Sequence, residues 1–103
     1  MNIQQMMKQA QALQAKMAKA QEELKVKELI GSSGGGKVKI TMNGAQEVTA
    51  VSIDPEVVNA SEADLLEDLV LAAFRDARSK VTRLIEEEMG KVTGGAGLPP
   101  GLF

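Results

Sequence analysis

The sequence predicts an α+β fold, in which a long N-terminal helix, a three-stranded antiparallel meander and a long C-terminal helix follow one another (α-β-β-β-α). Apolar residues recur at helical spacing near both ends of the chain, and they alternate as in a strand around a central Asn-Gly pair. The chain has 103 residues, 44% of them hydrophobic, which suits one domain with one small core. Residues 1–90 are predicted to form that domain, and residues 91–103 a flexible Gly/Pro-rich tail.

The first helix is predicted by a heptad seam. Apolar residues alternate at spacings of three and four over three repeats: Ile3, Met6, Ala10, Leu13, Met17, Ala20 and Leu24. No Gly or Pro interrupts this pattern before Gly31. The residues from Val26 to Ile30 fit a short strand that begins the meander, although they could also continue the helix.

The middle of the chain is typical of a β-hairpin. Apolar residues alternate with polar ones and lead into Asn43-Gly44: Val38, Ile40 and Met42. The Asn-Gly pair suits a two-residue type I′ turn. This turn would pair Met42 with Ala45 and Val38 with Thr49.

The predicted register gathers apolar residues on one face of the hairpin. Val51 and Ile53 would join the apolar face of the preceding strand. Glu47 would also fall on that face, close to the turn, so a bulge near it is an alternative. Asp54-Pro55 is expected to end the second strand.

A second long helix is predicted from about Ser61 to Met89. Ser61 and Asp64 resemble a capping box, and Gly90 is expected to stop the helix. At roughly 100° per residue one side is apolar: Leu66, Val70, Ala73, Ala77, Val81 and Leu84. The acids from Glu86 to Glu88 lie where the helix dipole disfavours them. Either the positive N-terminal end of an antiparallel first helix neutralises these carboxylates, or they are an ordinary solvated acidic run.

The composition argues against an enzyme. The chain contains no Cys and no His, so it lacks the usual general base and the usual zinc ligands, and no cofactor or small-molecule substrate is expected. Gly34-Gly35-Gly36-Lys37 resembles part of a phosphate loop, but it leads into a strand instead of a helix, which predicts a turn between strands. No apolar run could span a membrane and no signal-peptide pattern is present, so the cytoplasm is the expected location.

Four segments in this order resemble the YbaB/EbfC family of small bacterial nucleoid-associated DNA-binding proteins: Gln4 to Met17, Gly34 to Pro55, Leu66 to Ala77 and Leu98 to Leu102. The resemblance covers nearly the whole chain. It implies a sheet-based homodimer with protruding helices that binds DNA in the nucleoid. The small core independently favours association with a second copy.

Two basic helix faces are the predicted DNA contacts. The formal net charge is −2, so binding depends on the local density of Lys and Arg. The first helix offers Lys8, Lys16 and Lys19. The second offers Arg75, Arg78 and Arg83 opposite its apolar side. Antiparallel packing is expected to bring Lys8 level with Arg83 and Lys16 level with Arg75, and the resemblance supports Lys8, Lys16, Arg75 and Arg78 as contacts.

Few aromatic residues are available to stack on bases. Phe74 and Phe103 are the only two, which favours duplex DNA over single strands and phosphate contacts with low sequence specificity. Such binding would organise the nucleoid and influence gene expression. The alternative is a protein–protein adaptor that uses the heptad helix, with Met6, Met7 and Met17 as contact residues.

Overall fold

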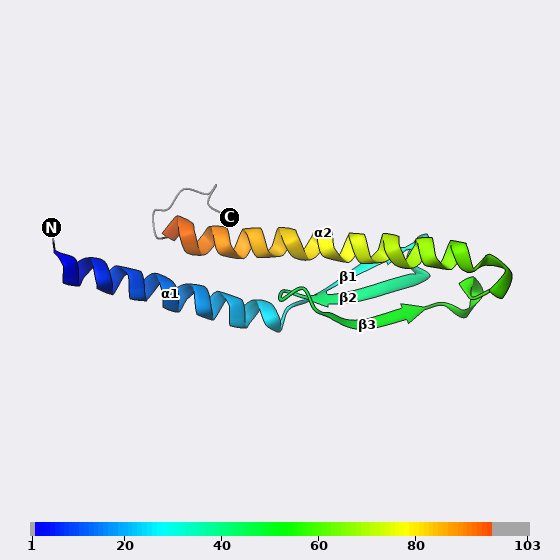
Figure 1. Ribbon diagram of the computed structural model, residues 1–103, viewed down its shortest axis with the longest axis horizontal. Coiled ribbons are helices and arrows are strands. Elements are labelled where there is room, and N and C mark those ends of the chain that lie inside the picture. Colours follow the sequence, from blue (N-terminus) through cyan, green and yellow to red (C-terminus); the bar gives the residue numbers. More distant parts are fainter. Residues whose placement is uncertain (1, 96–103) are drawn as a thin grey trace.

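The structure, a computed structural model, describes residues 2–95. The elements are α1 (Ile3–Lys25), β1 (Glu28–Ser33), β2 (Val38–Asn43), β3 (Val48–Ile53) and α2 (Ala63–Gly95), with 3₁₀ turns at Gly34–Gly36, Pro55–Val57 and Ala60–Glu62. The predicted α+β order is therefore confirmed. The molecule is elongated, at 70 × 22 × 16 Å. One half of α2 lies over the sheet and the other half lies beside α1 (Figure 1).

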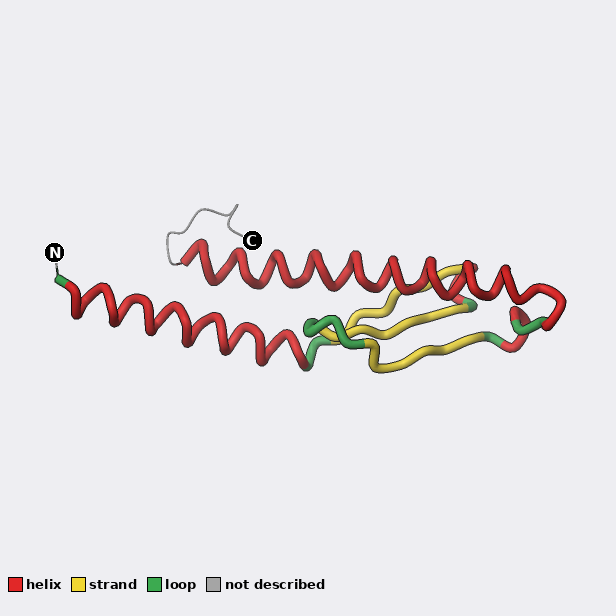
Figure 2. Tube along the Cα trace, in the orientation of Figure 1, coloured by secondary structure: helices red, strands yellow, loops and turns green. Residues whose placement is uncertain are grey.

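The sheet is a meander with β2 at its centre, and α2 packs chiefly on β1 and β2 (Figure 2). The core joins β2 to α2 and contains Val38, Ile40, Met42, Ala73, Ala77 and Val81. β3 lies at the edge, beyond the cover of the helix. Its apolar residues therefore remain open to solvent, with Val51 54% and Ile53 38% exposed.

The hairpin register differs from the prediction. Val38 pairs with Ile53, and Met42 pairs with Val48 after an irregularity between Thr41 and Met42. The two-residue turn is wrong, because four residues separate the strands. The expectation that Val51 and Ile53 share the apolar face of β2 is confirmed, since they lie directly opposite Ile40 and Val38.

The buried side chain of Asn43 explains the longer turn. Its Oδ1 accepts hydrogen bonds from the backbone N–H groups of Ala45 (2.9 Å) and Glu47 (3.0 Å), and its Nδ2 donates to the Glu47 carboxylate (3.2 Å). These bonds satisfy the turn's backbone donors without the tight two-residue geometry.

Gly44 is needed for close packing. A Cβ at this position would lie 2.3 Å from the carbonyl oxygen of Leu24. The Gly44 N–H donates instead to the carbonyls of Leu24 (2.9 Å) and Lys27 (3.1 Å). The tip of the hairpin is thereby fastened to the end of α1.

β1 is confirmed as a strand, but it begins at Glu28 instead of Val26 and continues through Gly31 to Ser33. Gly31 is where α2 approaches most closely: a Cβ there would lie 2.2 Å from the Ala77 nitrogen and 2.4 Å from the Ala73 oxygen. The missing side chain lets the helix lie directly on the strand, so the glycine belongs inside the strand and does not end it.

The three glycines after β1 form the turn into β2, as predicted. All three have positive φ, at 60°, 68° and 90° for Gly34, Gly35 and Gly36. This backbone is costly for residues with a Cβ, which accounts for the glycine run without a phosphate-binding role.

α2 extends further than predicted. It begins at Ala63, after a 3₁₀ turn. The side chain that caps this turn is Asn59 and not the predicted Ser61: the Asn59 side chain accepts a hydrogen bond from the Ser61 N–H (3.0 Å). The predicted stop at Gly90 is wrong, since the helix reaches Gly95. Met89 and Val92 pack with the end of α1, and this burial outweighs the cost of about 1 kcal/mol for a helical glycine. The part of the predicted tail at 96–103 lies outside the described residues.

The two helices run antiparallel where they meet. Ala20 and Leu24 are buried against Leu84, Ile85 and Met89. The Glu88 carboxylate accepts from Lys27 Nζ at 3.1 Å and pairs with Lys91 at 3.5 Å. The N-terminus of α1 does not compensate Glu88, because only the last turns of α1 lie beside α2. Within residues 2–95, neither helix has the length and apolar character needed to cross a membrane.

Candidate nucleic-acid interface

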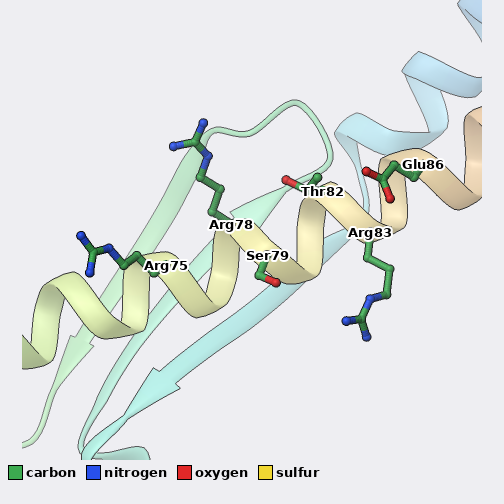
Figure 3. A pocket seen from close by; sticks show the side chains of 6 residues that line it. All are labelled: Arg75, Arg78, Ser79, Thr82, Arg83 and Glu86. Atoms are coloured by element: carbon green, nitrogen blue, oxygen red, sulfur yellow. The ribbon is translucent and has the colours of Figure 1, made fainter. Parts of the chain in front are cut away.

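α2 carries three arginines on the side facing away from the sheet. Ala73, Ala77 and Val81 face the core, so residues about 100° to 160° away around the helix point outward. Six outward residues line an open hollow of about 440 Å³, and Figure 3 shows their side chains: Arg75, Arg78, Ser79, Thr82, Arg83 and Glu86. Arg78 points to one side of the helix and Arg83 to the other. We call Arg75, Arg78 and Arg83 the arginine patch.

The arginine patch is exposed, and its members form no ion pair with the described part of the chain. The ion pairs found among residues 2–95 use Lys25, Lys27, Lys37, Lys80 and Lys91, and none of the three arginines. A free guanidinium presents a planar set of donors that matches a phosphate group. Glu86 is the only acid in the lining of the hollow, so the local charge is positive.

A second basic cluster lies between the helices. Lys16 and Lys19 of α1 line a hollow of about 280 Å³ together with Lys91 of α2, and Glu23 and Glu88 also contribute to it. We call Lys16, Lys19 and Lys91 the lysine groove. Lys91 was missed in the sequence because residue 91 was assigned to the tail. Val92, three residues after the apolar Met89, was the signal that the helix continues.

The structure does not bring the two basic clusters together. The predicted levels are wrong: Lys16 lies beside Lys91 and not beside Arg75. Arg75 and Lys91 lie 16 positions apart along α2, or about 24 Å at 1.5 Å per residue. Lys8 lies about 12 Å further along α1, past the lysine groove, and so is not level with Arg83. The sheet causes this offset, because it occupies the first half of α2 and leaves only the second half for α1.

Two acidic side chains, Asp76 and Glu88, join different elements of the fold. The carboxylate of Asp76 accepts a hydrogen bond from the Ser32 N–H (2.9 Å), which ties β1 to α2, and it pairs with Lys80 Nζ (3.2 Å). The Ser32 hydrogen bond, and then Lys80, lower the pKa of Asp76. Hydrogen bonding from Lys27 lowers the pKa of Glu88. Among residues 2–95, no group of three His, Cys, Asp or Glu side chains is arranged to hold a metal ion.

An apolar groove borders the arginine patch. It measures about 580 Å³ and is lined by Ile40, Ala63, Leu66, Glu67, Val70, Leu71 and Phe74. Ile40 pairs with Val51, so the exposed apolar edge of β3 continues the groove. Leu71 is 47% exposed and lies one helical turn before Arg75. Continuous exposed apolar surface of this kind is typical of sites that contact another protein, a membrane or a ligand.

Comparison with known proteins places the chain among DNA-binding relatives. A family model described as the YbaB/EbfC DNA-binding family matches residues 1–96. A nucleoid-associated protein of Rhodospirillum rubrum is 46% identical over 101 residues, which cover 98% of this chain and 94% of that protein. One from Dictyoglomus turgidum is 55% identical over 97 residues, covering 94% and 93%.

A solved structure shares the fold. The crystal structure of an uncharacterized protein from Helicobacter pylori matches with a TM-score of 0.76 over 84% of this chain and 91% of that one. The sequence identity is 20%, so the likeness concerns the fold alone.

Proposed function

Because this chain belongs to the YbaB/EbfC DNA-binding family, we propose that it acts in the nucleoid by binding double-stranded DNA as a homodimer, mainly through phosphates. The observation that carries this proposal is the arginine patch, whose three guanidinium groups are exposed and form no ion pair within residues 2–95. Curated relatives named nucleoid-associated proteins support the nucleoid as the location.

Low sequence specificity follows from the kind of contact. The basic side chains stand on the outer surfaces of long helices and are spread along the molecule. Contacts from such side chains to phosphates fix position and orientation but carry no base information. The protein would then coat or shape DNA broadly, and would influence nucleoid organisation and gene expression through DNA shape.

The homodimer is proposed to form over the apolar groove and β3. The free edge of β3 and the exposed Val51 and Ile53 form a surface that a second copy can cover by presenting the same surface. Because the groove borders Arg75, this arrangement would place the arginine patches of both copies on adjoining surfaces. A combined patch compensates for the net charge of −2 on each chain.

The salt dependence of DNA affinity tests the phosphate contacts. Each neutralised phosphate contributes about −0.9 to the slope of log affinity against log salt. Six arginines in a dimer predict a slope of about −5, and a loss of affinity of about 10³-fold between 50 and 200 mM salt. Fluorescence anisotropy with duplexes of unrelated sequence should give similar slopes and affinities. A salt-independent affinity would favour an adaptor that binds through apolar surface.

A single charge in the proposed dimer contact tests the assembly. Val51→Asp should leave the monomer folded, because Val51 is exposed there, but it should prevent dimerisation by burying an unpaired carboxylate. Ser52→Asp is the matched control on the other face of β3. Sedimentation velocity at micromolar concentration should show a dimer for the wild type and for Ser52→Asp, and a folded monomer for Val51→Asp. A monomeric wild type would refute the homodimer.

A further inference from the structure

The first half of α1 carries an apolar stripe that is exposed in the described structure. Ile3 is 70% and Met6 53% exposed, and Ala10 is exposed as well. The same seam continues through the half-buried Leu13 and Met17 to Ala20 and Leu24, which are buried against α2. The seam is therefore buried near the C-terminal end of α1 and exposed near its N-terminal end, which we call the tip of α1.

The open part extends past the helix that covers the base. Val92 of α2 lies beside Lys16 and Lys19, and the described part of α2 ends three residues later at Gly95. The turns of α1 nearer the N-terminus continue beyond that end (Figure 1). Their spacing of three and four is that of a helix that packs against another helix.

The charges around the stripe fit a second copy of the same segment. From Ile3 to Ala15 the positions flanking the seam are neutral (Met7, Gln9 and Gln14), and Lys16 flanks it at the end nearer α2; Lys8 lies on the opposite side of the helix. Over the neutral positions two identical segments can approach without repulsion between like charges. An anionic membrane would instead favour several Lys or Arg on the flanks, and from Ile3 to Met17 the only flanking charge is Lys16.

We propose that the segment from Ile3 to Met17 pairs with the same segment of a second copy, as a short coiled coil. This contact is separate from the proposed dimer contact at β3. It would join two dimers, and with them two duplexes or two stretches of one duplex. Lys8 stays on the outside of the pair, where it can reach phosphate.

The length of the segment sets the strength of the pairing. Two heptads are close to the lower limit for a stable helical assembly, so the contact is weak in dilute protein. Binding of several dimers to one DNA raises their effective concentration and populates the contact without any new interaction. Tip pairing is thus expected to make DNA binding cooperative.

Cysteine cross-linking tests this proposal, since the chain has no natural Cys. Ala10 lies at the centre of the segment from Ile3 to Met17, so Ala10→Cys meets its counterpart in both parallel and antiparallel pairing. Ala15→Cys, on the opposite side of α1, is the matched control. Under mild oxidation with duplex DNA present, Ala10→Cys should form disulfide-linked chains several-fold faster than Ala15→Cys. Equal rates would overturn the proposal.

The mass of the linked species separates this proposal from the homodimer. Four chains by light scattering would support tip pairing between two β3-linked dimers. Two chains would contradict the joining of two dimers through their α1 tips. A double variant, Ala10→Cys with Leu102→Cys, tests the rival occupant, the chain's own residues 96–103. A disulfide within a single chain of this variant would assign the stripe to that segment and overturn the proposal.

Discussion

Replacing Gly31 with alanine is expected to separate α2 from the sheet and unfold the protein. The new Cβ would lie 2.2 Å from the Ala77 nitrogen and 2.4 Å from the Ala73 oxygen, which are backbone atoms of a rigid helix. The helix would have to move away at the point where both alanines are fully buried. Overpacking and loss of core contacts of this kind cost several kcal/mol, against a total stability of about 5–15 kcal/mol.

Gly90→Ala is the matched control for this substitution. Apart from its chain neighbours and the adjoining backbone of its own helix, a Cβ at Gly90 would meet no atom of the described residues within 4 Å, and the residue lies inside α2. Alanine there should stabilise the protein by up to about 1 kcal/mol through helix propensity. Thermal unfolding followed by circular dichroism distinguishes the two variants. A Gly31→Ala protein that melts at the wild-type temperature would contradict the close approach of α2 to β1.

Reversing Arg75 and Arg78 to glutamate should remove most DNA binding while leaving the fold intact. Both side chains are exposed and form no ion pair among the described residues, so their loss leaves the core unchanged. In a dimer the change removes four phosphate contacts, which should flatten the salt slope by about 3.6, and it adds repulsion from four carboxylates. The affinity should fall by about 10²-fold or more at low salt, equally for all duplex sequences.

The matched control places the same change of charge on the sheet. Lys37→Glu with Lys39→Glu alters the net charge equally, but Lys37 already pairs with Glu56 at 2.9 Å, a contact that raises the pKa of its ammonium group. This variant should bind DNA more tightly than the arginine double variant. If the arginine variant, still folded and dimeric, bound with wild-type affinity and slope, the sheet lysines would become the leading candidates.

The order of elements could be predicted because it depends on the spacing of apolar residues along the chain. Ala73, Ala77 and Val81 were placed on one side of the second helix, and all three are fully buried. The hairpin turn could not be predicted in the same way. Its length depends on hydrogen bonds from the buried Asn43 side chain, and Gly44 is needed because Leu24, twenty positions earlier, packs against it.

The candidate site could be predicted residue by residue but not as an arrangement. A helical wheel shows that the arginines lie opposite the core, and the structure agrees. The offset between the two basic clusters depends on the length of the sheet. The sheet covers the first half of α2, so α1 can pack only beside the second half. Lys91 was missed because local propensity at Gly90 favours a helix end, whereas tertiary packing of Met89 and Val92 continues the helix.

The attachment of α1 at Gly44 makes this helix a lever with its pivot at the tip of the hairpin. Its 23 residues form a rod about 34 Å long at 1.5 Å per residue. A rotation of about 10° at the base therefore moves the far end by about 6 Å, which is the width of the DNA minor groove. The burial of Ala20 and Leu24 against α2, the two hydrogen bonds from the Gly44 N–H and the Lys27–Glu88 contact all restrain that rotation. Small changes among these few residues would thus shift Lys8, a proposed phosphate contact, although none of them lies near it.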